Sequence, residues 1–109
     1  LDRRAHSTEV IELLVTPSGL FPKKIEAPPG DYVLVIRRAD FEAPVRLDLV
    51  ASTGRKVTIT AMDARARSRR EVIRLRPGVY VASIFGSMEP EWTATIQVDP
   101  LAKERTSSN

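Results

Sequence analysis

The chain contains no cysteine and a single histidine, His6, among its 109 residues. The missing cysteine excludes disulfides, thiolate metal sites, iron–sulfur clusters and cysteine nucleophiles. One histidine near the N-terminus excludes a zinc site made of histidines alone and disfavours a Ser-His-Asp triad. No apolar run reaches the roughly 18 residues of a membrane-spanning helix, and we expect no signal peptide within the given residues. Because the chain starts at Leu1 rather than at Met, we expect Leu1 either to follow a removed signal or anchor or to be an artificial boundary.

The remaining composition is that of an ordinary globular protein. Hydrophobic residues make up 42% and charged residues 28% of the chain, and the net charge is +3. This length suits one domain with its own core. We expect that domain at residues 10–99, after a flexible lead-in at 1–9 and before a frayed, polar tail at 100–109.

Short extended runs separated by proline and glycine predict an all-β fold of about seven or eight strands. The runs expected to form strands are 10–15, 24–27, 32–37, 45–49, 56–61, 72–75, 79–85 and 92–98. The one helical competitor is 63–71, where Asp63 suits an N-cap. That segment has no apolar face, so we expect no helix longer than about two turns.

Two parts of the chain resemble the cupredoxin family. Near the N-terminus, Phe-Pro-Lys-Lys-Ile at 21–25 precedes Gly-Asp-Tyr-Val at 30–33. Near the C-terminus, Leu-Arg-Pro-Gly-Val-Tyr-Val at 75–81 is similar to the family's Pro-Gly-x-Tyr strand entry, and Ala-Thr-Ile-Gln-Val at 94–98 to its closing strand. The resemblance implies a cupredoxin-like Greek-key β-sandwich of two packed sheets.

The same resemblance argues against bound copper. Cupredoxins hold copper with two histidines, one cysteine and usually a methionine. Alignment with the family places Val45, Ile84, Ser87 and Trp92 at these four positions. None of the four is a copper ligand, and the nearby thioether of Met88 cannot hold the metal alone. We therefore expect no cofactor and no electron-transfer activity.

What remains is the scaffold. We expect a non-catalytic, metal-free module that binds protein or gives structural support in the bacterial cell envelope, in the periplasm or another extracytoplasmic location, as part of a larger membrane-associated complex. The location is implied by the resemblance, because such domains are usually exported. Glu89 and Glu91 resemble a catalytic carboxylate pair only in spacing, so an enzyme is not expected. The first alternative is a copper or redox electron-transfer protein with ligands elsewhere.

Residues 85–91 form the loop that follows the Pro-Gly-x-Tyr strand. Phe85, Met88 and Trp92 are the candidates for a partner-binding patch on this loop, since loops on a rigid scaffold often carry binding. Packing of the sandwich end explains them equally well. Trp92 is expected to pack beneath the loop with its ring mostly buried, and an exposed interface anchor is the alternative.

Six arginines lie within twelve residues: Arg65, Arg67, Arg69, Arg70, Arg74 and Arg76. As a second alternative function, this cluster makes the protein an anion-binding module for lipid headgroups or an acidic partner. Nucleic acid is disfavoured because no aromatic residues interleave with the arginines. The cluster is otherwise a solvated surface whose arginine stems cover apolar residues. In an extended segment Arg65, Arg67 and Arg69 share one face.

Overall fold

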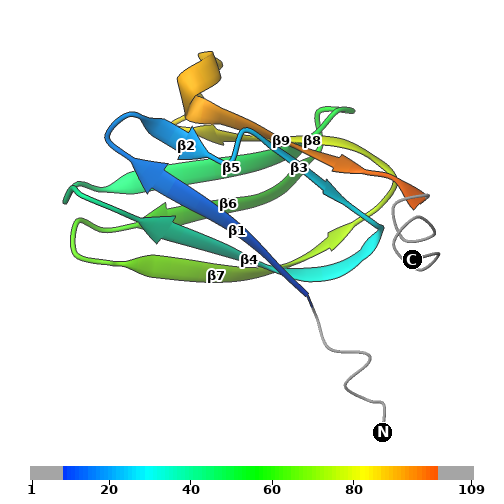
Figure 1. Ribbon diagram of the computed structural model, residues 1–109, viewed down its shortest axis with the longest axis horizontal. Helices are drawn as coiled ribbons and strands as arrows, with labels where there is room; N and C mark the ends of the chain where they lie inside the picture. The colour runs from blue at the N-terminus through cyan, green and yellow to red at the C-terminus, as the bar shows by residue number, and fades with distance from the viewer. Residues whose placement is uncertain (1–8, 101–109) are drawn as a thin grey trace, which may run out of the picture.

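The computed structural model, which describes residues 9–100, is a sandwich of two β-sheets (Figure 1). The four-stranded sheet has the order β2-β1-β4-β7, formed by β2 (Gly19–Phe21), β1 (Glu9–Thr16), β4 (Gly30–Arg38) and β7 (Ser68–Leu75). The five-stranded sheet has the order β3-β9-β8-β5-β6, formed by β3 (Lys24–Ala27), β9 (Thr93–Val98), β8 (Gly78–Ile84), β5 (Val45–Ala51) and β6 (Lys56–Met62). β1 pairs with β4 in parallel, as β3 does with β9, and the other pairs are antiparallel.

The all-β prediction is confirmed, with nine strands among residues 9–100. The additional strand is β2, three residues long and bounded by turns. Among residues 9–99 the only helical element is the 3₁₀ turn η2 (Pro90–Trp92). No helix in this part of the chain has the length and apolar character needed to cross a membrane.

Alternate side chains of the strands build most of the core, because successive side chains of a strand point to opposite faces, although β4, β5 and β8 each have three consecutive buried residues. The fully buried large residues come from both sheets: Leu13, Val15, Leu20, Leu34, Ile36, Leu47, Leu49, Leu75 and Ile96. Tyr80 adds a polar anchor, since its hydroxyl accepts a hydrogen bond from the Arg76 N–H at 2.9 Å and donates one to the Arg76 carbonyl at 3.2 Å. The core therefore runs along the full interface between the sheets.

The segment at 63–71 is divided between a turn and a strand. Asp63 Oδ1 accepts the N–H groups of Arg65 and Ala66, both at 2.9 Å, as an N-cap does, but β7 begins at Ser68 and no helix follows. The sequence predicted this strand only from residue 72. Its first residues, 68–71, are polar or charged and show no apolar alternation. β6 also departs from its apolar pattern, since Thr60 is buried and Ile59 is 47% exposed.

The connections that follow β4, β6 and β8 gather at one end of the sandwich, together with η2 (Figure 1). β1 begins and β9 ends at the opposite end (Figure 1). The predicted lead-in at 1–9 and tail at 100–109 fall outside the described residues, except for Glu9 in β1 and Pro100, and His6 lies outside them too. The end that carries the gathered loops is the place to look for a site, because loops on a fixed scaffold carry most binding functions.

Candidate functional site

A strained turn leads the chain out of β8. The Ser87 N–H donates to the Ile84 carbonyl at 2.9 Å, and the two residues between them, Phe85 and Gly86, have φ angles of 54° and 71°. Positive φ is easy for glycine and uncommon for a bulky aromatic residue. Such a conformation costs on the order of 1–3 kcal/mol. The fold nevertheless keeps Phe85 there, with 62% of its surface exposed.

The short helix η2 contacts β2 and the connection between β2 and β3. Lys23 Nζ donates to the carbonyls of Pro90 and Glu91, at 3.0 and 2.9 Å. Gly19, at the start of β2, lies so close to η2 that a Cβ placed there would be 2.2 Å from the Glu91 carbonyl oxygen. The contacts with Lys23 and Gly19, which are distant from η2 in the sequence, therefore fix the position of η2 relative to β2. They also fix the position of Trp92, which belongs to η2.

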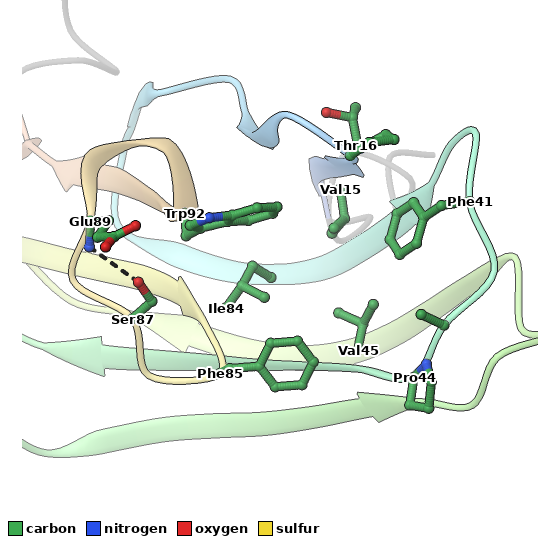
Figure 2. A pocket seen from close by; sticks show the side chains of 12 residues that line it. Val15, Thr16, Phe41, Pro44, Val45, Ile84, Phe85, Ser87, Glu89 and Trp92 are labelled. Atoms are coloured by element: carbon green, nitrogen blue, oxygen red, sulfur yellow. Dashed lines mark hydrogen bonds between the residues drawn. The ribbon is translucent and has the colours of Figure 1, made fainter.

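These loops enclose a largely apolar cavity of about 380 Å³, which we call the loop-end pocket (Figure 2). Its lining residues come from the end of β1, the β4–β5 connection and the loop after β8: Val15, Thr16, Pro17, Phe41, Ala43, Pro44, Val45, Ile84, Phe85, Ser87, Glu89 and Trp92. Figure 2 shows the rings of Trp92 and Phe41 on opposite sides, with Val15 between them and Ile84 below Trp92. A pocket of this kind suits an apolar occupant with few polar contacts.

The structure brings together two of the three residues predicted as a partner-binding patch. Phe85 and Trp92 both line the loop-end pocket, whereas Met88 is 74% exposed and is not part of the lining. Trp92 is partly buried and packs against the hydrophobic core, in keeping with the expectation that more of it is covered than exposed. The ring is at once an end-packing residue and a wall of the pocket.

All four positions that the cupredoxin alignment equates with copper ligands line the loop-end pocket. Val45, Ile84, Ser87 and Trp92 come from β5, β8, the following loop and η2, and the fold collects them at one place. Two aliphatic side chains, a hydroxyl and an indole offer no soft or imidazole ligand for copper. The chain has no cysteine, and residues 9–100 contain no group of three or more metal-ligating side chains. The pocket does not fit copper.

The six arginines of the cluster do not form a single patch. Arg70 and Arg74 lie on the outer face of the four-stranded sheet with Val72, which is 82% exposed. Arg65 and Arg67 precede β7 and line a second cavity of about 150 Å³ beside the β4–β5 connection. The other two arginines are also exposed, Arg69 in β7 and Arg76 just after it.

Two residues of this end were missed by the sequence reasoning. Phe41 lines both cavities, and Arg38, at the end of β4, is only 6% exposed and lines the second one. The signal for Arg38 was available, because the alternation that buries Leu34 and Ile36 continues to position 38. Phe41 lies in an irregular connection, where no periodicity assigns a direction.

One ion pair of the cluster has a measurable consequence for pH dependence. Arg74 Nε donates to Asp31 Oδ1 at 2.8 Å across the β4–β7 pair. This hydrogen bond and the charge of Arg74 together hold the pKa of Asp31 below its ordinary value. The stabilisation is therefore present above the ordinary pKa and is lost as the pH falls through the lowered one. Both side chains are exposed, so we expect a small effect.

We expect Arg74→Ser to raise the pKa of Asp31 toward its ordinary value, with little change in the free energy of unfolding at neutral pH. The measurement is an NMR titration of the Asp31 carboxyl carbon in both proteins. Identical titration curves would mean that the ion pair does not persist in solution.

Comparison with known proteins reveals similarity at the level of structure. The sequence matches no protein-family model and no curated protein. Auracyanin A, a "blue" copper protein from Chloroflexus aurantiacus, is 8% identical and has a TM-score of 0.67, over 85% of this chain and 100% of its own.

Two further copper-protein structures are similar. A reduced amicyanin variant is 11% identical with a TM-score of 0.60, over 87% of this chain and 88% of its own. Rusticyanin from Thiobacillus ferrooxidans is also 11% identical with a TM-score of 0.60, over 85% of this chain and 79% of its own. Sequence identities this low establish a common fold and nothing finer. The fold of this chain is therefore a cupredoxin-like β-sandwich.

Proposed function

We propose that this protein is a metal-free, non-catalytic cupredoxin-like module that binds a protein partner through the loop-end pocket. The observation that carries the proposal is the pocket itself. An apolar cavity of about 380 Å³ lies where the family alignment puts the copper ligands, and aromatic rings form its walls. A side chain of a partner that enters this cavity gains roughly 25 cal/mol for each Å² of apolar surface removed from water.

The backbone at Phe85 supports a binding role. The left-handed backbone conformation of Phe85 costs free energy in the unbound protein. The side chain is 62% exposed, so packing of the core does not require this conformation. Strained residues of this kind cluster at sites where the strain serves function. An aromatic side chain next to a pocket is also the usual form of a binding hot spot.

The pocket does not support catalysis. Glu89 is the only residue with a carboxylate, amine, guanidinium or imidazole group among those that line it. A hydroxyl nucleophile needs a base within hydrogen-bond distance, and the hydrogen bonds of Thr16 and Ser87 include none to the Glu89 carboxylate. Glu89 and the hydroxyls of Thr16 and Ser87 instead give the pocket a few polar contacts that orient an occupant.

We place the module in the cell envelope, as part of a larger membrane-associated assembly. The support for this location is the cupredoxin resemblance, because domains of that family are usually exported. A neighbouring domain or another subunit of a membrane complex is then the natural source of the apolar side chain.

Trp92 is the only tryptophan of the chain, so its fluorescence reports directly on the pocket. We expect N-acetyl-phenylalaninamide, which mimics a phenylalanine of a partner chain, to shift the Trp92 emission to shorter wavelength and to saturate. Phe85→Ser should weaken this binding about tenfold, because it removes an aromatic wall of the pocket. The measurement is a fluorescence titration of both proteins.

Met88→Ser is the matched control, since Met88 is an exposed apolar residue of the same loop that does not line the pocket. Its affinity for the probe should equal that of the unaltered protein. Equal losses in the two variants would show that the loop surface binds and the cavity does not. Co-purification of a partner from the envelope should likewise depend on Phe85 and not on Met88.

A further inference from the structure

Arg38 is a buried guanidinium without a counter-charge among the described residues. Its side chain points inward from the end of β4 and is 6% exposed. Nη1 donates to the Ala43 carbonyl, and Nη2 to the Asp63 carbonyl at 2.5 Å. The Phe41 ring lies 5.2 Å from the guanidinium carbon. Within residues 9–100 no carboxylate pairs with it, and Nε has no hydrogen-bond partner.

This arrangement leaves the charge of Arg38 poorly compensated. A guanidinium has five N–H groups, and two carbonyls and an aromatic face account for only part of its needs. A buried cation normally has a paired anion, because removing it from water is expensive. The fold therefore keeps a charge in place that an external anion would neutralise.

A cavity adjoins this charge, and more positive charge surrounds it. The cavity measures about 150 Å³ and is lined by Arg38, Arg65 and Arg67, with Phe41, Glu42 and two alanines. The cavity is small, so it suits a small anion. Arg65 and Arg67 are exposed, so they can turn toward an anion without a change in the core.

We propose that Arg38, Arg65 and Arg67 form a binding site for a single phosphate- or sulfate-type oxyanion. Arg38 supplies the fixed, buried charge, and the other two arginines close over the anion from the turn between β6 and β7. Planar guanidinium groups match the geometry of tetrahedral oxyanions through paired hydrogen bonds. Glu42 lines the same cavity, and its negative charge repels an anion and lowers the affinity of the site.

The test is a titration with inorganic phosphate, followed by the amide NMR signals of residues 38–42 and 63–67. We expect saturable binding, with an affinity about tenfold lower in the Arg65→Ser/Arg67→Ser double variant and higher in Glu42→Gln. The matched control is Arg70→Ser/Arg76→Ser, which removes the same charge from two exposed arginines outside the cavity. Its affinity should change by less than about threefold, because distant exposed charges are screened.

Arg38→Met should abolish binding, and its folding is checked by circular dichroism. Where this variant does not fold, the two double variants still decide the question. Equal losses in both double variants would overturn the site in favour of diffuse attraction to the whole cluster. Absence of saturable phosphate binding, or an adventitious ion only, with weak binding that ignores every substitution, would overturn it as well.

The same anion chemistry has two sources, a free ion and the phosphate of a lipid headgroup. Vesicles of phosphatidylglycerol separate them, with phosphatidylcholine vesicles as the control. Vesicle binding that needs Arg38, Arg65 and Arg67 and is displaced by phosphate supports the headgroup. Phosphate binding without any vesicle binding supports the free ion.

Discussion

Leu34→Ala is expected to lower the free energy of unfolding by about 3–5 kcal/mol. Leu34 is fully buried at the centre of β4, which lies between β1 and β7 and faces the second sheet. Truncation removes the transfer free energy of the lost methyl and methylene groups and leaves a cavity that rigid strands on both sides cannot collapse into. Chemical denaturation followed by circular dichroism measures the change.

Val72→Ala is the control on the same sheet. Val72 belongs to β7, pairs with the residue before Leu34 and is 82% exposed on the outer face. It should change stability by less than about 0.5 kcal/mol, as exposed substitutions usually do. A Leu34→Ala loss as small as that of Val72→Ala would contradict the packing of the two sheets.

Gly19→Ala is expected to cost about 3 kcal/mol or more, although it adds only a methyl group. Its Cβ would lie 2.2 Å from the Glu91 carbonyl oxygen, so η2 would have to move away from β2. The φ angle of 148° adds backbone strain that only glycine avoids. Overpacking and strain of this kind each cost on the order of 1–3 kcal/mol.

Gly78→Ala separates the two causes. Gly78 has a similar φ of 142°, but a Cβ there meets nothing within 4 Å. It should therefore show the strain without the collision, and a smaller loss of stability than Gly19→Ala. The collision should also appear in the Trp92 fluorescence of Gly19→Ala, because η2 carries that ring into the loop-end pocket. If both variants lost the same stability and the Trp92 fluorescence of Gly19→Ala were unchanged, the added methyl group would be accommodated beside Glu91 without a free-energy cost.

The sequence predicted the fold better than the details of its edges. Every run with apolar alternation or β-branched residues became a strand, since alternation directly encodes a buried and an exposed face. β2 was missed because its three residues are too few to alternate. β7 extends further than predicted because its first residues are arginines and serine, and only pairing with β4 makes them a strand. Ile59 faces outward because the register with β5 places Thr60 opposite Leu47, on the core side.

The site was predicted in part. Phe85 and Trp92 stood out because they are large apolar residues in a polar loop, and the family alignment placed Val45 and Ile84 near them. Their assembly into one cavity depends on the β4–β5 connection, whose course no local pattern specifies. The alternation along β4 points Arg38 inward, but its partners could not be predicted, because they are backbone carbonyls of irregular segments, which no residue type marks.

Phe41 separates the loop-end pocket from the arginine cavity, with its ring near the guanidinium of Arg38 on one side and across from Trp92 on the other. The two cavities share this ring as a common wall. An occupant that shifts the ring in one compartment changes the shape of the other, and linkage requires the effect on affinity to be the same in both directions. At this end of the sandwich, one aromatic side chain would make an apolar occupant and an anion allosteric effectors of each other.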